Sequence, residues 1–224
     1  MNDIIRKIKM GKSNAYLVNT EKGYILVDAG MENKINKVQE ILTKISAKWE
    51  DIILIIITHV HYDHVGSLYD LREKTKAKVL VHEKEKRLLQ EGKTNFPKGT
   101  MFLSKIISKL GNLFLEGKFK PVNPDITIED YYDLKKYGIE GKVIHTPGHT
   151  EGSLSVIIEE KNIICGDTLF NILPNSVYPP FANDKKKLIE SWKKINKYSC
   201  DKFYPGHGDI FDRKKFIKTL KRKK

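Results

Sequence analysis

The stretch Thr58-His59-Val60-His61-Tyr62-Asp63-His64 places four side chains that can bind metal within six residues. It follows Ile52 to Ile57, an apolar and mostly β-branched run that is typical of a strand buried on both faces. Because side chains alternate along an extended chain, we expect the first two histidines to point the same way. The aspartate and the last histidine then lie at the turn into a helix. Burying three histidines beside an acid is costly without a shared ligand, so the stretch predicts a metal site.

Two further histidines occur in similar surroundings, in Thr146-Pro147-Gly148-His149-Thr150 and Tyr204-Pro205-Gly206-His207-Gly208. Each motif follows a predicted strand. Proline ends strand pairing and glycine permits a sharp turn, so each histidine should project from a rigid loop. Between them, Cys165-Gly166-Asp167-Thr168 places an aspartate just beyond a predicted strand. A lone aspartate there is usually a turn residue, but the histidine motifs make this one a candidate ligand.

Together with Leu26-Val27-Asp28-Ala29-Gly30, these motifs resemble the metallo-β-lactamase fold superfamily over nearly the whole chain, and its HxHxDH signature is matched in full. The resemblance implies an α+β fold, a four-layer αββα sandwich of two mixed sheets flanked by helices, with two metal ions at one edge. It also implies the ligands: His59, His61 and His149 for the first metal, Asp63, His64 and His207 for the second, Asp167 bridging both, and Asp28 steadying the site from behind without touching metal.

The ligand types predict the chemistry of the site. Imidazoles and carboxylates suit two Zn²⁺ ions, with iron or manganese as alternatives. Two metals can share a water and lower its pKa to about 7, and a net positive centre favours a substrate that gains negative charge. The predicted function is therefore hydrolysis of an ester, lactone or thioester by a metal-bridging hydroxide. Asp63 could also carry a proton to the leaving group, which makes it the candidate catalytic residue.

Three other functions stay open. The basic tail would suit a phosphodiesterase or nuclease, one iron would suit a dioxygenase resembling persulfide dioxygenases, and a metal-dependent binding protein needs no turnover. True β-lactamases lack the bridging aspartate that Asp167 would supply, so antibiotic hydrolysis is not expected. Glyoxalase II relatives carry a long C-terminal helical domain, whereas only 17 residues follow His207, so we do not expect that thioester as substrate.

The pattern predicts one domain over residues 1–224. Expected strands cover 4–10, 15–19, 24–28, 52–57, 78–81, 126–128, 141–146, 153–159, 162–165 and 202–204, and expected helices cover 33–47, 66–75, 83–90, 184–198 and the tail from 212. Residues 91–124 follow a helical pattern with a broad apolar face. This helix could pack on the body, join two subunits of a homodimer, or form a lid over a substrate with an apolar portion. Phe170 and Tyr178 either pack in the core or line the substrate pocket.

The composition and charge of the chain restrict the kinds of binding partner that we expect. Hydrophobic residues make up 40% and charged residues 31% of the 224, which is typical of a soluble globular chain. No apolar run approaches the roughly 20 residues of a membrane span. Two cysteines and no signal-peptide pattern predict a reducing, cytoplasmic setting. The net charge is +13, but eight basic residues gather in the C-terminal tail 212–224, and the other lysines are scattered. We therefore expect a small-molecule substrate in preference to nucleic acid.

Three residues outside this set, His145, Cys165 and Cys200, are expected to be structural, and His82 is expected at the surface or at the start of a helix. A histidine inside or at the end of a strand more often satisfies its neighbours than binds a ligand. The predicted ligands already fill two metal sites, so we expect both cysteines to be buried.

Overall fold

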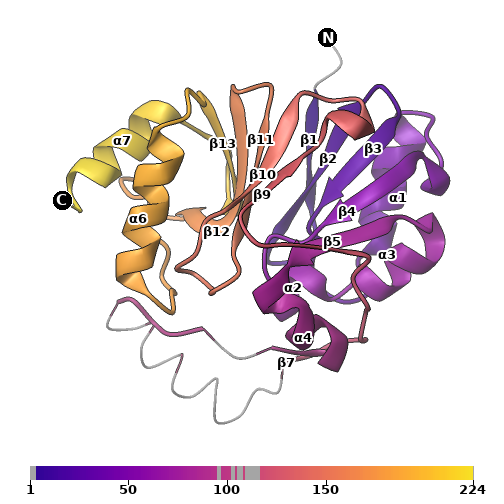
Figure 1. The fold of residues 1–224 in the computed structure, drawn as a ribbon, viewed down its shortest axis with the longest axis horizontal. Coiled ribbons are helices and arrows are strands. Elements are labelled where there is room, and N and C mark those ends of the chain that lie inside the picture. Colours follow the sequence, from indigo (N-terminus) through magenta and orange to yellow (C-terminus); the bar gives the residue numbers. More distant parts are fainter. Residues whose placement is uncertain (1–3, 95–96, 102–103, 105–107, 109–116, 224) are drawn as a thin grey trace.

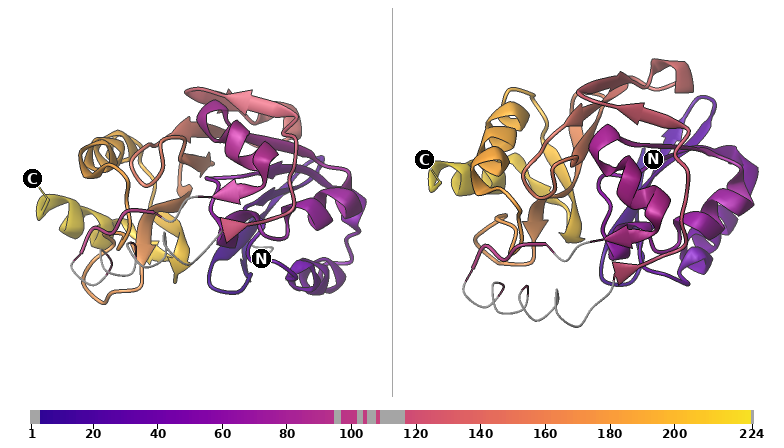
Figure 2. Two further views of the ribbon diagram at one scale, coloured as in Figure 1. Left: turned by 90° about the horizontal axis from the view of Figure 1, so that it is seen from below. Right: turned by 60° about the horizontal axis from the view of Figure 1, so that its bottom comes forward.

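Two mixed β-sheets lie face to face between layers of helices in the computed structural model (Figure 1). The structure describes residues 4–94, 97–101, 104, 108 and 117–223. The four layers are those of an αββα sandwich, which confirms the predicted fold class. Figure 2 shows from two further sides that the N-terminal and C-terminal helices cover opposite faces of the paired sheets.

The first sheet has the strand order β1-β2-β3-β4-β5-β8. Its strands are β1 (Ile5–Lys9), β2 (Asn14–Thr20), β3 (Gly23–Val27), β4 (Ile52–Ile56), β5 (Lys78–His82) and β8 (Ile126–Ile128). β1, β2 and β3 pair antiparallel, and β3, β4, β5 and β8 pair parallel. β4 therefore lies inside the sheet, with four of its five residues fully buried, as its apolar sequence predicts.

The second sheet has the strand order β14-β13-β12-β11-β10-β9. Its strands are β9 (Tyr131–Asp133), β10 (Gly141–His145), β11 (Leu154–Ile158), β12 (Asn162–Asn171), β13 (Lys202–Gly208) and β14 (Phe211–Asp212). β12 and β13 pair parallel, and the other neighbours pair antiparallel. A separate two-stranded ladder joins β6 (Lys93–Thr94) and β7 (Gly117–Lys118).

Helices cover the outer faces of both sheets. They are α1 (Ile35–Lys44), α2 (Tyr62–Val65), α3 (Leu68–Thr75), α4 (Glu83–Glu91), α6 (Lys185–Asn196) and α7 (Arg213–Lys221), with short 3₁₀ turns at Trp49–Asp51 and Lys135–Tyr137. α1 and α3 flank the first sheet, and α6 and α7 flank the second (Figure 1). Asp184 caps α6 as predicted, because its carboxylate accepts the backbone N–H groups of Lys186 and Lys187.

Apolar clusters fill the spaces between the layers. One lies between the first sheet and its helices, where Val38 and Leu42 of α1 meet strand residues. A second lies between the sheets and joins residues such as Leu54 and Val156. A third surrounds Trp192 of α6, which is fully buried. Burial of this apolar surface is the main force that holds the layers together.

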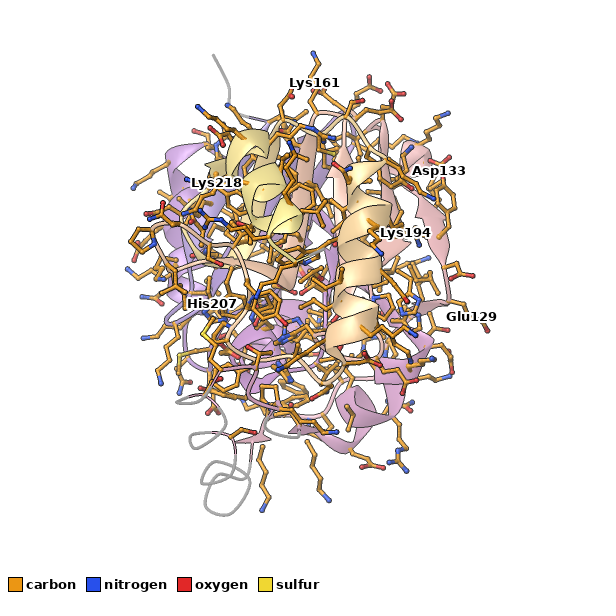
Figure 3. All side chains as sticks on the ribbon, turned by 90° about the vertical axis from the view of Figure 1, so that its left-hand side faces the viewer. Glu129, Asp133, Lys161, Lys194, His207 and Lys218 are labelled. Carbon is orange, nitrogen blue, oxygen red and sulfur yellow. The ribbon has the colours of Figure 1, made fainter. Side chains whose placement is uncertain are left out.

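The C-terminal tail is part of the body. Phe216 of α7 is fully buried and stacks on Phe203, with ring centroids 4.9 Å apart. The helix presents its lysines outward, and Figure 3 labels Lys218 on α7 and Lys194 on α6 on this face. The basic residues therefore belong to a packed amphipathic helix, which matches the helical prediction for the tail.

Some predicted boundaries were wrong. Helix α1 begins at Ile35 rather than Asn33, which has φ 59° and does not cap it. Strand β12 continues through Asp167, and β13 continues through the Pro205-Gly206 pair, so the sequence placed both strand ends too early. The pairing of β12 with β13 shifts register around Gly166, which lets both strands continue past an irregularity.

The apolar helix expected within 91–124 lies for the most part outside the described residues. Among the residues that the structure does describe, no helix is long and apolar enough to cross a membrane.

Candidate metal centre

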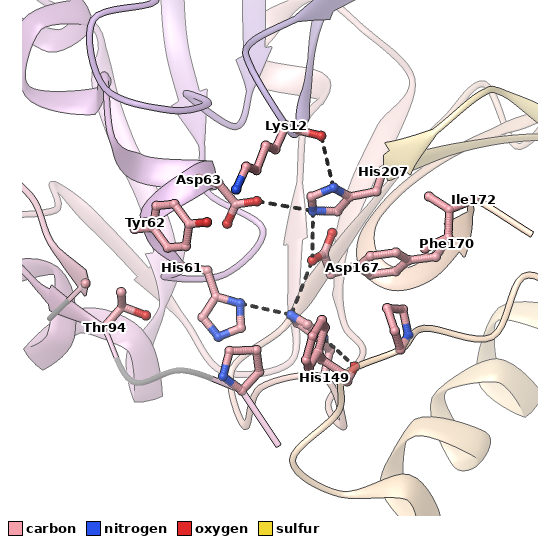
Figure 4. A pocket seen from close by; sticks show the side chains of 14 residues that line it. Lys12, His61, Tyr62, Asp63, Thr94, His149, Asp167, Phe170, Ile172 and His207 are labelled. Carbon is pink, nitrogen blue, oxygen red and sulfur yellow. Dashed lines mark hydrogen bonds and ion pairs between the residues drawn. The ribbon is translucent and has the colours of Figure 1, made fainter. Parts of the chain in front are cut away.

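The predicted ligands meet at one end of the sandwich, where loops of the first sheet face strands of the second (Figure 4). Two groups form, and within each the ligand atoms lie within 4.8 Å of one another. The first group holds His59, His61, His149 and Asp167, and the second holds Asp63, His64 and His207. Side chains from four distant stretches of sequence are thus brought together.

Local geometry explains the placement of the first four side chains. The chain leaves β4 in extended form, and the rings of His59 and His61 lie with centroids 4.6 Å apart. His61 is still extended, with φ −116° and ψ 148°, and α2 begins at the next residue. This change from strand to helix turns Asp63 and His64 toward the centre from another side.

Nitrogen and oxygen atoms of the first group converge closely. Nδ1 of His61 lies 3.0 Å from Nε2 of His149. Oδ2 of Asp167 lies 3.4 Å from Nε2 of His149 and 3.8 Å from Nε2 of His59. A cation between these atoms would replace repulsion between the nitrogen lone pairs by attraction.

Asp167 also reaches the second group. Its Oδ2 lies 3.3 Å from Nε2 of His207, and its Oδ1 lies 3.3 Å from Nε2 of His64. Nε2 of His207 lies 3.3 Å from Oδ2 of Asp63. Asp167 therefore stands between the two groups, at the place a bridging ligand would occupy.

Outer hydrogen bonds orient three of the histidines. Nδ1 of His149 donates to the carbonyl of Phe181 at 3.0 Å, and Nδ1 of His207 donates to the carbonyl of Lys12 at 3.1 Å. Nδ1 of His59 lies 3.0 Å from the hydroxyl of Thr58. With the proton on Nδ1, the Nε2 lone pair of each ring is free to bind a metal.

Asp28 completes this outer layer. It accepts the backbone N–H of Thr58 at 2.8 Å through Oδ1, and it accepts Nδ1–H of His64 at 2.9 Å through Oδ2. The residue has φ 64°, a left-handed conformation that aspartate tolerates better than most side chains. Asp28 thus lies behind the site, as the resemblance implies, and is absent from both ligand groups of the described chain.

Two buried atoms at the centre make no hydrogen bond within the described part of the chain, Nε2 of His59 and Oδ1 of Asp167. Both residues are at most 5% exposed, so solvent access does not explain these atoms. Leaving buried polar atoms unpaired costs about 1–3 kcal/mol each. A buried nitrogen and a buried oxygen that make no hydrogen bond to a described residue, the oxygen with an ionic contact of 3.3 Å to Nε2 of His64, fit ligands of a divalent cation.

The first group is electrostatically suited to neutral imidazoles. Burial, followed by the neighbouring histidines, lowers the pKa of His59 well below its usual value. Burial and His149 lower the pKa of His61 to about 3. Neutral imidazole is the form that binds metal, so these side chains offer their lone pairs without competition from protons.

The histidines of the second group have raised pKa values, in contrast to His59 and His61 of the first. Burial opposes a charge on His64 and His207, but nearby carboxylates, with Asp167 the strongest, outweigh it. They raise the pKa of His207 to about 9 and that of His64 well above its usual value. Burial likewise opposes a charge on Asp63, but His64 and His207 lower its pKa to about 2. A metal ion here would have to displace protons.

Glycine is required where the backbone approaches the centre. A Cβ on Gly206 would lie 2.1 Å from Oδ1 of Asp167 and 2.8 Å from Cε1 of His64. The Pro205-Gly206 pair therefore brings the strand close to the other ligands, whereas the sequence predicted that it would end the strand.

A cavity of about 370 Å³ opens onto the centre (Figure 4). His61, Asp63 and His207 form its floor, and Phe170 and Ile172 form part of an apolar wall. Phe170 also stacks on His207, with ring centroids 4.6 Å apart and planes at 12°. The prediction that Phe170 lines a pocket is confirmed.

Tyr178 does not line this cavity. It is 8% exposed and packs against Trp192, with ring centroids 5.7 Å apart. Of the two alternatives for Tyr178, packing is therefore the one that the structure shows, because the residue belongs to the apolar cluster around Trp192.

The remaining histidines lie apart from the two groups. Nε2 of His82 donates to the carbonyl of Glu129 at 2.6 Å, and Nε2 of His145 donates to the carbonyl of Glu151 at 2.9 Å. These partners support the structural role predicted for His145. His82 lies at the start of a helix, as one of its two alternatives predicted, because it caps α4, and it is buried, so it does not lie at the surface. Cys165 and Cys200 are fully buried and free, as predicted.

Sequence reasoning missed Lys12 and Thr94, which line the cavity from the first sheet and from β6. It also missed Ser13, whose hydroxyl donates to the carbonyl of Asp63. Neither the spacing nor the residue types around these positions signalled a site. Among the residues that surround the ligands, Thr58 could have been suspected of a role in the site, because it directly precedes His59 in the motif.

Comparison with known proteins agrees with this geometry. A sequence model of the metallo-beta-lactamase superfamily matches residues 8–207. A probable metallo-hydrolase of Methanocaldococcus jannaschii is 35% identical over 210 residues, 91% of this chain and 91% of that protein. A probable metallo-hydrolase of Bacillus subtilis is 30% identical over 169 residues, covering 74% of this chain and 71% of that protein.

Solved structures share the fold. A metallo-beta-lactamase superfamily protein from the archaeon Sulfolobus tokodaii superposes with a TM-score of 0.70 and 24% identity, covering 97% of this chain and 85% of that one. The B3 metallo-beta-lactamase BLEG-1 superposes with a TM-score of 0.73 and 22% identity, covering 95% of this chain and 96% of that one. At these identities the likeness concerns the fold alone.

Proposed function

The chain is a metal-dependent hydrolase that belongs to the metallo-beta-lactamase superfamily, and we propose that it cleaves an ester, lactone or thioester of a small molecule at a centre of two divalent ions. The observation that carries the proposal is the position of Asp167 between two groups of ligands. Its carboxylate lies 3.4 Å from His149 on one side and 3.3 Å from His207 on the other.

The ligand roles follow from the two groups. His59, His61 and His149 would hold the first ion, Asp63, His64 and His207 the second, and Asp167 both. Imidazole and carboxylate ligands favour zinc, with iron or manganese as alternatives. When bound, two such ions polarise a carbonyl and lower the pKa of a shared water to about 7.

The charges of the protein support acyl transfer. The two carboxylates of Asp63 and Asp167 do not neutralise two divalent ions, so the centre remains positive. A positive centre stabilises the oxygen that becomes negative when a carbonyl is attacked. Asp63 borders the cavity, where its carboxylate would take up the proton that the attacking water releases. It would then pass this proton to the leaving group.

The cavity supports a substrate with an apolar portion. Phe170 and Ile172 line one side of it (Figure 4), and Phe181 is a further apolar residue of its lining. Lys12 and Tyr62 lie on the other side, near Asp63 (Figure 4). Pockets of this kind bury the apolar part of a ligand and use a few polar groups to orient it.

The test has two stages. Elemental analysis of the purified protein should find two equivalents of a divalent metal, with zinc expected. The loaded enzyme should then hydrolyse members of a panel of p-nitrophenyl esters, lactones and thioesters of increasing acyl length, with lower KM for longer chains. The chelator-treated protein and the Asp63→Ala variant are the controls, and both should be inactive.

Failure would be equally clear. If the loaded enzyme hydrolyses none of the acyl substrates, the proposal is wrong. Turnover of bis(p-nitrophenyl) phosphate alone would assign a phosphodiesterase. If elemental analysis finds one iron and the protein consumes oxygen when a persulfide is added, the protein is a dioxygenase.

A further inference from the structure

Glu85 is a buried carboxylate that belongs to neither ligand group. It lies on α4 and is 2% exposed. Its Oε2 accepts the backbone N–H of Val60 at 2.9 Å, and its Oε1 accepts the backbone N–H of Gly152 at 3.1 Å. One side chain thus joins two segments of backbone that are far apart in the sequence.

Both segments carry ligands of the first group. Val60 is the residue between His59 and His61, and Gly152 follows His149 by three positions. A backbone hydrogen bond also joins these segments, from Leu154 N–H to the carbonyl of Thr58 at 2.8 Å. Beyond that bond, the carboxylate of Glu85 bridges them.

The backbone carbonyl of Val60 is bound as well. The hydroxyl of Thr94, three residues beyond the end of α4, donates to the carbonyl of Val60 at 2.8 Å. Residues from α4 and β6 therefore bind both backbone polar groups of Val60, the residue that joins the two ligand histidines.

The side chain of Glu85 also lies close to the backbone of the second segment, at Gly152. A Cβ on Gly152 would lie 2.5 Å from Cγ of Glu85 and 3.1 Å from Cβ of His82. Any side chain at this position would push α4 away from the loop. Glycine permits the direct contact between the carboxylate and the loop that carries His149.

We propose that Glu85 is a positioning residue that sets the separation of His61 and His149 and thereby the metal affinity of the first group. The ring nitrogens of these two histidines lie 3.0 Å apart. Their spacing depends on the two loops that Glu85 ties together. The inference rests on the proposed function only in taking the first group as a metal site.

A carboxylate is needed because both partners are donors. Its two oxygens each accept one N–H. A glutamine has one oxygen, so its NH₂ group would face the N–H of either Val60 or Gly152. Two donors that face each other in a buried place repel, and one loop would move away from α4.

The experiment compares Glu85→Gln with Glu83→Gln, which changes an exposed glutamate on the same helix that pairs only loosely with Lys86 at 3.7 Å. Metal-free protein is titrated with Co²⁺ in the presence of a competing chelator, and binding is followed by visible absorption. His149→Ala, which removes a ligand from the first group, identifies the binding step that belongs to that group.

We expect Glu85→Gln to weaken the first-group step by roughly 10- to 100-fold, the usual range for outer partners of metal ligands. The absorption bands of that step should shift, while the step of the second group and both steps of Glu83→Gln should match the wild type. Unchanged affinity and spectrum in Glu85→Gln would overturn the inference, and so would equal weakening of both steps.

A second variant keeps the test decisive if Glu85→Gln does not fold, as judged by circular dichroism. Thr94→Val removes the hydroxyl that donates to Val60 and leaves Glu85 in place. Thr94→Val should weaken Co²⁺ binding in the first-group step by several-fold. An unchanged affinity in that step would contradict the proposal that the backbone of Val60 positions the two histidines. Because cobalt binding needs no substrate, the result is independent of whether the enzyme hydrolyses acyl substrates.

Discussion

Asp28 binds His64 from behind, and the 2.9 Å contact between Oδ2 and Nδ1 decides which nitrogen of that ring faces the centre. The same carboxylate holds the backbone of Thr58, directly before the first ligand histidine. One buried aspartate thus positions residues of both ligand groups. Outer partners of this kind fix the tautomer and orientation of metal ligands.

Replacing Asp28 by asparagine should weaken the second metal site. The asparagine oxygen would keep the bond to Thr58 N–H, and its NH₂ group would then donate to Nδ1 of His64. The ring proton would move to Nε2, the atom that faces the centre, and the lone pair would be lost to the metal. We expect metal affinity and kcat/KM to fall roughly 10- to 100-fold.

Metal titration and steady-state kinetics measure this effect. Asparagine tolerates the left-handed backbone at this position, so the change tests the hydrogen bond and leaves the turn intact. Asp133→Asn, at an exposed position, is the matched control and should behave as wild type. Wild-type metal affinity in Asp28→Asn would contradict the role assigned to this contact.

Asp167→Asn should affect both metal sites. The neutral amide offers one oxygen in place of two and carries no charge to offset the cations. We expect both steps of a metal titration to weaken, and activity to fall by more than the roughly 100-fold upper range for outer partners. Isothermal titration with zinc would show it, and loss of only one step would argue against a bridging role.

Metal removal should lower the stability of the folded protein. Ligands that bind only the native state stabilise it by about 2.7 kcal/mol at a free concentration 100 times Kd. Without the ions, Nε2 of His59 and Oδ1 of Asp167 remain buried and make no hydrogen bond within the described structure. Calorimetry with zinc and with chelator measures the difference, and equal melting temperatures would contradict the prediction.

The metal-free protein should lose stability as the pH rises above neutrality. His207 has a pKa of about 9 in the folded chain, above its usual value of 6.5. A raised histidine pKa means that the folded state binds the proton more tightly than the unfolded state. That stabilisation is complete below about pH 6.5 and disappears as the pH rises through about 9.

Melting temperatures of chelator-treated protein between pH 6 and 10 provide the measurement. They should fall across this window, and His207→Gln should show a shallower decline because one of the raised groups is gone. His64 contributes in the same direction. A melting temperature that increases from pH 7 to 9 would show that the proton does not hold these groups together.

Much of the fold could be read from local patterns. The buried strand Ile52–Ile56 and the strand Ile126–Ile128 lie where the sequence placed them. Their signals are β-branched content and length, which depend on neighbouring residues alone. The apolar helix expected within 91–124 stays a prediction.

The wrong ends predicted for β12 and β13 share a cause. The sequence ended β12 before Asp167 and β13 before Pro205, because glycine and proline usually end strands. In the folded chain these strands pair parallel with shifted register around Gly166, which has φ 47°. A bulge depends on the partner strand, and the partner cannot be read from local propensity.

The sequence alone indicated the family and the candidate ligands, because the HxHxDH motif and the two Pro-Gly-His motifs match the pattern of that family. Strand alternation also predicted that His59 and His61 point the same way. Only the tertiary structure decided that Asp167 stands between the two groups, that Asp28 and Glu85 hold them from behind, and that Phe170 and Ile172 wall the cavity. These relationships join residues tens of positions apart, and they exist only once packing of the two sheets brings their ends together.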